Sequence, residues 1–225
     1  SIPSVFIDGD KQKVDARGNV NLDGSVVIEY GHLYNLERIP SSVSLFNYTP
    51  EQSDLPSRYD SRDYGYVTPV KDQKEGGNCW AFSGIATLEA CIKKATGITY
   101  DFSEENAKNL MAEYFILSKD TESNEGGNRN MFVSYLNSWF GPVYDALDPY
   151  DDHSTLSLTY DPLLHIQNVY FLPDGDQLDI NVIKKAIMDD GAVTVSTIWD
   201  GEEYHAVSLI GWDDNYNGPD CFNIS

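Results

Sequence analysis

The sequence has few basic residues and no long apolar run. Lysine and arginine number 15 against 36 aspartate and glutamate residues, which gives a formal net charge of −21. Because a charge of this sign repels phosphate groups, we expect neither nucleic acid nor an anionic membrane surface as a partner. No stretch approaches the ~20 apolar residues of a membrane-spanning helix, so we expect no membrane insertion. The acidic composition suits an extracellular or cell-surface protein.

Cysteine is also scarce, and the three cysteines do not suggest a disulfide framework. Cys79 and Cys91 are 12 positions apart. On one helix this separation is a rise of ~18 Å, too far for a disulfide bond. Cys91 is either a small buried residue or a partner for Cys221 or for a cysteine outside this chain. The cysteine count therefore says nothing about the redox compartment.

One short stretch, residues 73–83, carries the strongest signal in the chain. A pair of glycines leads into Cys79, and apolar residues at helical spacing follow it, namely Ile85, Leu88 and Ile92. Gly97 comes after the last turn, where a glycine typically ends a helix. This pattern predicts a helix that begins at Cys79 and ends before Gly97.

The predicted position of Cys79 suits a nucleophile. Free backbone N–H groups and the helix dipole favour an anion at a helix N-terminus, and the thiolate is the reactive form of cysteine. Gln73 lies six residues upstream, close enough to fold back toward the sulfur. Its side-chain amide and the Cys79 backbone N–H would then donate to an oxygen that becomes negative during attack.

A candidate base for this nucleophile is His205. It opens an apolar run over residues 205–212, which reads as a short buried strand. The nucleophile and the base would therefore come from a helix in the first part of the chain and a strand near its end.

Together, these segments resemble the papain family of cysteine peptidases. The resemblance covers residues 55–215, with its most specific motifs at 55–63, 67–73, 78–83, 101–106, 124–128 and 205–207. The 126 positions between Cys79 and His205 (205 − 79) are close to the roughly 130–150 seen in this family. Residues 211–215 are most similar to surface-exposed bacterial and archaeal members. The resemblance implies an α+β fold of two lobes, helical first and strand-rich second, with the active site in the cleft between them.

The resemblance also implies the activity and the site. The expected function is a cysteine endopeptidase acting on a peptide or protein substrate, with Cys79 as nucleophile, His205 as base and Gln73 as oxyanion donor. It needs no metal and no organic cofactor. Substrate-binding positions are Asn78, Gly126, Gly127 and Tyr204. The two glycines alternatively serve only as turn formers.

Two departures from the family pattern favour an alternative function. The Asn-Ser-Trp-Gly segment that carries the catalytic asparagine does not occur, and Asn223 lacks the tryptophan and glycine around it. Only six residues, 199–204, join the strand predicted at 192–198 to His205. The alternative is a catalytically weak or inactive surface binding module. A third hypothesis is an acyl transferase or amidase that uses the same cysteine and histidine.

Residues 1–54 do not resemble the enzyme, so we divide the chain into an N-terminal pro-segment or flank (1–54) and a peptidase domain (55–225) whose C-terminal part looks incomplete. Residues 20–27 predict a hairpin turning at Asp23 and Gly24, or less favourably a calcium loop. An extended strip through residues 41–56 would lie in the cleft as an inhibitor, or would be a linker.

Further helices are expected at 103–117, 131–140 and 179–190, strands at 166–172 and 192–198, and a solvated acidic loop at 142–163.

Overall fold

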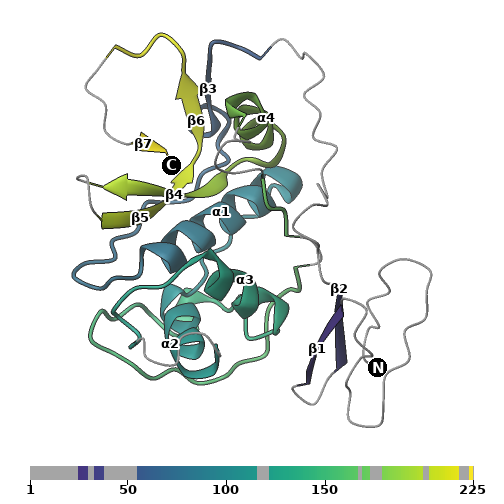
Figure 1. Ribbon diagram of the computed structural model, residues 1–225, viewed down its shortest axis with the longest axis vertical. Coiled ribbons are helices and arrows are strands. Elements are labelled where there is room, and N and C mark those ends of the chain that lie inside the picture. The colour runs from purple at the N-terminus through teal and green to yellow at the C-terminus, as the bar shows by residue number, and fades with distance from the viewer. Residues whose placement is uncertain are drawn as a thin grey trace. The chain divides into compact units, whose positions relative to one another are not determined.

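The computed structural model describes residues 25–29, 33–37, 55–115, 122–166, 169–172, 179–199, 203–217 and 223–224 (Figure 1). The chain divides into two units, Ser1–Asn47 and Tyr48–Ser225. In the first unit, β1 (Ser25–Glu29) and β2 (Leu33–Glu37) pair antiparallel. The turn expected at residues 23–24 lies outside the described residues, so the hairpin expected at 20–27 stays a prediction. No helix in the described ranges is long and apolar enough to cross a membrane.

The first lobe of the second unit is helical. It consists of α1 (Cys79–Thr96), α2 (Glu104–Tyr114) and α3 (Arg129–Asn137), with a short 3-10 turn η3 (Asp145–Leu147) beside them. The α1 helix ends at Gly97, which adopts a left-handed φ of 74° that glycine tolerates. Ser103 begins α2 by accepting a hydrogen bond from the Asn106 N–H at 2.9 Å. The three predicted helices of this lobe are therefore confirmed, apart from their ends.

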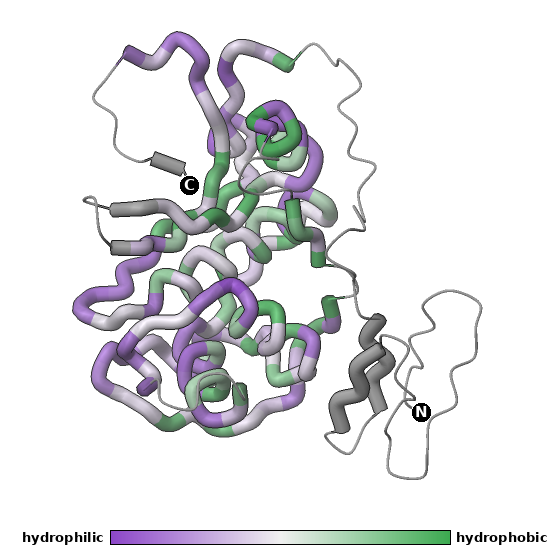
Figure 2. Tube along the Cα trace, viewed as in Figure 1, coloured by the Kyte–Doolittle hydropathy of each residue, from purple (hydrophilic) through white to green (hydrophobic). Residues whose placement is uncertain are grey.

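The core of the helical lobe is formed where α1, α2 and α3 meet. Its largest enclosed side chains are Trp80, Ile85, Phe102, Met111 and Tyr135. Figure 2 shows hydrophobic residues along α1 and α4 and hydrophilic residues in the loop that leads into α1. The helix that carries Cys79 is therefore anchored by apolar burial, and the loop before it is polar.

The second lobe is built from α4 (Ile180–Asp190), β3 (Arg58–Asp60), β4 (Val193–Trp199), β5 (Glu203–Leu209), β6 (Gly211–Asp213) and β7 (Asn223–Ile224), with a 3-10 turn η1 (Ser61–Tyr64) after β3. One sheet has the order β5-β4-β7, and β3 pairs antiparallel with β6. Tyr59, Ile183 and Ile187 form the buried centre of this lobe. The helix expected at 179–190 and the strand expected at 192–198 are confirmed.

The strand predicted at 205–212 is confirmed except for an interruption, whereas the strand predicted at 166–172 is wrong in its described part. The run at 205–212 is not one strand, because it is interrupted at Ile210, whose carbonyl accepts from the Ser61 N–H at 2.8 Å. The chain then continues as β6, and a Cβ on Gly211 would lie 2.3 Å from the Tyr59 carbonyl oxygen. The described part of 166–172 forms no strand. Ile166 instead packs on the helical core and Leu172 on the second core, so this segment crosses between the lobes.

The α1 helix lies between the two lobes (Figure 1). On one side it packs against α2 and α3 within the helical core. On the other side it meets the sheet, since the Thr87 and Ser208 hydroxyls are 2.7 Å apart and the Thr194 hydroxyl donates to the Ser83 carbonyl at 3.2 Å. The predicted architecture of a helical lobe followed by a strand-rich lobe is therefore confirmed.

Candidate active site

Cys79 is the first residue of α1 and carries a free, half-buried thiol. Asn78 precedes it as the N-cap, and its carbonyl accepts from the Ala81 and Phe82 N–H groups at 2.9 and 3.1 Å. No acidic side chain lies in the first turn. Cys79 therefore lies at a helix N-terminus without a competing carboxylate on the same turn, a position that favours an anion.

Gln73 lies in the loop that turns back onto this helix start. Its carbonyl accepts from the Gly76 N–H at 3.2 Å, and its side-chain Nε2 donates to the Gly76 carbonyl at 2.9 Å. One amide N–H of Gln73 is therefore bonded within the loop itself. A primary amide has a second N–H donor, and the role of Gln73 as an oxyanion donor stays a prediction.

The strand β4 runs antiparallel to α1, and two contacts fix how they are aligned. Near the end of the helix, the Cys91 thiol donates to the Ala192 carbonyl at 3.7 Å. Closer to its start, the Thr194 hydroxyl donates to the Ser83 carbonyl. The direction of β4 therefore leads toward the N-terminus of α1.

This alignment directs His205 toward the end of α1 that carries Cys79. Thr197 lies three residues beyond Thr194, about 10 Å along the strand, and Cys79 lies four residues before Ser83, about 6 Å along the helix. His205 is directly opposite Thr197 in the β4–β5 pair and is half-buried. The fold thus brings the predicted base to the end of α1 that carries the predicted nucleophile, and the roles of both residues stay predictions.

Gly126 and Gly127 lie beside the same loop. Gly126 has a φ of +115°, which disfavours other residues, and a Cβ on Gly127 would lie 2.2 Å from the Trp80 indole nitrogen. Both positions therefore require glycine for local reasons, as the turn-former alternative holds. Gly127 is also exposed, and its backbone forms no hydrogen bond within the described residues, so it is accessible to an extended peptide.

Asn78 requires a correction. It was expected to bind substrate, but it is 0% exposed, and its side-chain nitrogen donates to Asn124 Oδ1 at 2.9 Å and to the Tyr150 hydroxyl at 3.0 Å. An enclosed side chain with these partners joins loops and does not reach a ligand. Tyr204 is 75% exposed at the start of β5, and its proposed contact with substrate stays a prediction.

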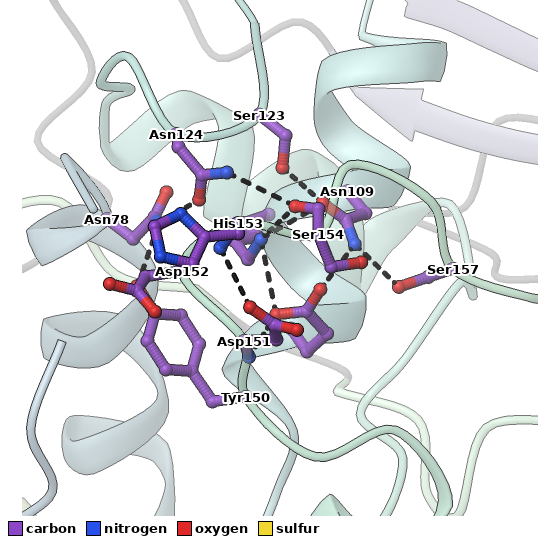
Figure 3. A network of polar contacts seen from close by, with 12 residues as sticks. Asn78, Asn109, Ser123, Asn124, Tyr150, Asp151, Asp152, His153, Ser154 and Ser157 are labelled. Carbon is purple, nitrogen blue, oxygen red and sulfur yellow. Dashed lines mark hydrogen bonds and ion pairs between the residues drawn. The ribbon is translucent and has the colours of Figure 1, made fainter. Parts of the chain in front are cut away.

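Sequence reasoning missed Tyr150, which belongs to the stretch expected to be a solvated loop. Its hydroxyl donates to the Gln73 carbonyl at 2.8 Å and accepts from Asn78. Figure 3 shows the network that it shares with Asn78, Asn124 and residues 151–157. An aromatic residue within an acidic stretch was the available signal, but the sequence does not indicate which loop it contacts.

An ion cluster around the partly buried Lys71 holds the chain just before Gln73. The Lys71 ammonium lies 2.7 Å from Asp101 and 3.1 Å from Glu104, and it donates to the Phe102 carbonyl at 2.8 Å. Burial alone would lower the pKa of Lys71, but Glu104 and the neighbouring carboxylates raise it above its usual value. Burial raises the pKa of Glu104 to about 7, although the charge of Lys71 and its hydrogen bond act in the opposite direction. Lys71 thus stays charged and fixes the start of the loop.

Cys91 is a free thiol that is half-buried, where the sequence suggested a fully buried residue or a disulfide. Burial raises its pKa to about 11, and its partner is the Ala192 carbonyl. Cys221 lies outside the described residues. Within the part of the chain that is described, no group of three or more His, Cys, Asp or Glu side chains is placed to hold a metal ion.

The structure does not bring Asn223 beside His205. Asn223 pairs with Ile198 in β7, whereas His205 and Ile224 are the residues paired with Thr197. The strand β4 lies between them, so Asn223 is two strands away and one position out of register. The short connection before His205 belongs to a hairpin of β4 and β5. These strands pair as far as Trp199 and Glu203, so that residues 200–202 link them.

Comparison with known proteins decides the family. A sequence model described as "Papain family cysteine protease" matches residues 55–224. The chain belongs to this family. Cathepsin K of Mus musculus is 44% identical over 82 residues, covering 35% of this chain and 25% of the cathepsin. Cathepsin L of Sarcophaga peregrina is 27% identical over 180 residues, covering 76% of this chain and 48% of the cathepsin. The chain thus spans a quarter to about half of the length of these curated relatives.

Solved structures confirm the papain-like fold. The cysteine protease and lectin-like domains of Cwp84, a surface layer associated protein of Clostridium difficile, match with a TM-score of 0.60 and 27% identity over 73% of this chain and 41% of that one. Digestive procathepsin L 3 of the Tenebrio molitor larval midgut matches with a TM-score of 0.62 and 22% identity, over 79% and 61% of the two chains.

Proposed function

We propose that this chain is a cysteine endopeptidase that hydrolyses peptide bonds in peptide or protein substrates. The observation that carries the proposal is the position of Cys79 at the start of α1, within a papain-family domain in which β5, the strand of His205, packs against α1. Neither residue alone would support a reaction. A thiol at a helix N-terminus with an imidazole beside it would form a nucleophile and its base.

The reaction has two halves. In the first, the Cys79 thiolate attacks the peptide carbonyl carbon, the C–N bond breaks, and the His205 imidazolium gives its proton to the departing amine. In the second, His205 takes a proton from water, the resulting hydroxide displaces the sulfur from the thioester, and the Cys79 thiolate is restored. No metal or organic cofactor takes part in either half.

The oxyanion of each half would be held by two donors. One is the free amide N–H of Gln73, and the other is the Cys79 backbone N–H, which forms no hydrogen bond within the described residues. Donors fixed before the reaction stabilise the charge that develops in the transition state. We place the substrate as an added strand along Gly126 and Gly127, with Tyr204 flanking the cleft.

Peptide-library cleavage with the chain and with Cys79→Ala tests the proposal. We expect cleavage by the parent and none by the variant, because no other nucleophile is placed at this site. Parental cleavage by Cys79→Ala would overturn the proposal. Aminolysis in preference to hydrolysis would indicate the acyl transferase or amidase.

The second candidate is the papain-like surface binding module, favoured by the position of Asn223 outside the row of His205. An unoriented imidazole loses orders of magnitude in rate. Stoichiometric labelling of Cys79 without cleavage would favour this module. Comparison with a chain to which an Asn-Ser-Trp-Gly segment has been added tests the orienting role directly, and we expect the chain with this segment to be much more active.

We further propose that the protein acts outside the cell or on its surface, as a relative of the surface-exposed bacterial and archaeal members. The net charge of −21 and the likeness to the surface layer protein Cwp84 support this.

Residues 1–54 are proposed as a pro-segment whose strip 41–56 occupies the cleft. Cutting near residue 54 should raise both activity and the rate of Cys79 alkylation. Unchanged alkylation after removal of residues 1–54 would leave the linker alternative.

A further inference from the structure

We propose that Tyr150 is a positioning residue for this reaction, because its hydroxyl holds the loop that carries Gln73 against the helix that carries Cys79. The proposal rests on the proposed function. Tyr150 touches no reacting atom, and it would act through the two residues that its hydroxyl contacts.

The hydroxyl of Tyr150 joins both ends of the loop. It donates to the Gln73 carbonyl at 2.8 Å and accepts from the Asn78 side-chain nitrogen at 3.0 Å. Its ring meets Phe82, in the first turn of α1, edge to face at 4.7 Å. One side chain therefore contacts the proposed oxyanion donor, the N-cap of α1 and the turn behind the nucleophile.

The loop is shaped around this hydroxyl. A Cβ on Gly76 would lie 2.5 Å from the Tyr150 oxygen and 2.6 Å from the Asn78 nitrogen, so no side chain fits at position 76. Gly76 stands where many family members have a cysteine in a disulfide. Here the polar contacts of Asn78 with Tyr150 and Asn124 occupy that space.

The segment that bears Tyr150 is itself fixed by α2. The Asp151 N–H donates to Glu105 at 2.9 Å, and the Lys108 ammonium donates to the Ser154 carbonyl at 2.6 Å (Figure 3). Lys108 and Glu105 form an ion pair at 3.2 Å, with side chains that are 0% and 2% exposed. A rigid support on α2 means that the Tyr150 hydroxyl imposes its position on the loop.

The contact persists at the pH where a peptidase of this kind would work. Burial raises the pKa of Tyr150, so the phenol keeps the proton that it donates to the Gln73 carbonyl. Removing the hydroxyl should therefore free the Gln73 end of the loop and leave its amide less well placed.

Tyr150→Phe is the direct test, measured by steady-state peptide hydrolysis. Loss of an oxyanion donor costs about 10²–10³ in kcat, and we expect a displaced donor to cost less, about tenfold in kcat with KM within about twofold. Tyr135→Phe is the matched control. Its hydroxyl is also buried and hydrogen-bonded, to Asn106 at 2.9 Å, but it lies in the helical core. The control should keep the parental kcat.

A double-mutant cycle shows whether Tyr150 acts through Gln73. We expect Tyr150→Phe to lower kcat little further once Gln73→Ala is present, because the contact then positions nothing. Gly76→Ala, which forces the hydroxyl away, should lower kcat as Tyr150→Phe does. An undiminished tenfold loss in the Gln73→Ala background, or a parental kcat in Tyr150→Phe, would overturn the proposal.

A second measurement does not depend on turnover. In a chain with isotope-labelled glutamine, Gln73→Ala identifies the side-chain amide signal of Gln73 in the NMR spectrum. That signal should shift in Tyr150→Phe and stay in place in Tyr135→Phe, and an unchanged signal in Tyr150→Phe would overturn the proposal. If the parent chain cleaves no peptide, the proposed function fails, and the amide signal alone then decides whether Tyr150 positions Gln73.

Discussion

The two lobes differ in how firmly they hold their part of the proposed active site. The helical lobe encloses Cys79's helix in a broad core and also buries Lys108 and Glu105 as an ion pair. The strand-rich lobe has a smaller buried cluster, formed by Tyr59, Ile183 and Ile187, and the described residues from His205 to Trp212 are all half-buried. The nucleophile and its oxyanion loop are thus fixed within one lobe, whereas the base depends on how the second lobe packs against α1.

The largest expected difference between the lobes concerns their ion pairs. Lys108→Ala leaves Glu105 buried without its partner, which should lower the free energy of unfolding by about 3–5 kcal/mol. Lys184→Ala is the matched change in the strand-rich lobe, where Lys184 pairs with the half-exposed Asp214, and should cost about 0–1 kcal/mol. Urea unfolding measures both. Equal losses would show that the two lobes are not held differently.

The second prediction concerns Gln73, which should affect the rate of the reaction but not the stability of the helical lobe. Gln73→Ala should lower kcat by about 10²–10³, as expected for one lost oxyanion donor. Because Gln73 is half-buried and bonds only within its own loop and to Tyr150, the urea midpoint should not change. A fall in stability that parallels the fall in kcat would mean that the loop supports the fold and not the reaction.

The lobes should also respond to pH in opposite directions. Burial raises the pKa of Glu104 from 4.5 to about 7, so the unfolded chain loses this proton first and the folded state loses stability as pH rises from about 4.5 to 7. Glu104→Gln should remove this decline. In the other lobe, hydrogen bonds from Arg62 lower the pKa of Asp60 below 3.8. The stabilisation by ionised Asp60 is present above about pH 4 and is lost on further acidification. Asp60→Asn should therefore reduce the fall in the free energy of unfolding below about pH 4.

The smallest expected effect is at the contact between the lobes. Ser208→Ala removes the hydroxyl that lies 2.7 Å from Thr87, while Thr87 keeps its hydrogen bond from Thr194 at 2.8 Å. We expect a loss of about 0.5–1.5 kcal/mol in the free energy of unfolding. A loss of several kcal/mol would mean that this single contact holds the lobes together, which would make the second lobe far less independent than its small core suggests.

Local sequence signals predicted the elements that carry the site. Ser103 and Asp179 cap helices where their side-chain oxygens reach a free backbone N–H, and Gly97 ends α1. These signals depend on a few neighbouring residues, so the sequence contains them in full. The same is true of Cys79, whose position at a helix start follows from the apolar spacing behind it.

The errors arose where the structure depends on distant contacts. The described part of 166–172 forms no strand, although the segment is rich in apolar residues, and the run from His205 is interrupted at Ile210, whose carbonyl accepts from the Ser61 N–H. Asn78 was assigned to substrate from its place beside Cys79, although its partners are 46 and 72 positions away. No local pattern indicates that Tyr150 reaches the loop of Gln73.

The central claim is that Cys79 and His205, from different lobes, act as a pair. The most direct measurement is the rate of Cys79 alkylation by a mild reagent at pH 6, in a Cys221→Ser background. Cys91 will not interfere, since burial raises its pKa to about 11. We predict one equivalent of label in the parent and a rate at least about tenfold lower in His205→Ala, because an adjacent imidazolium favours the thiolate. Equal rates in the two proteins would contradict the pairing of the lobes at this site.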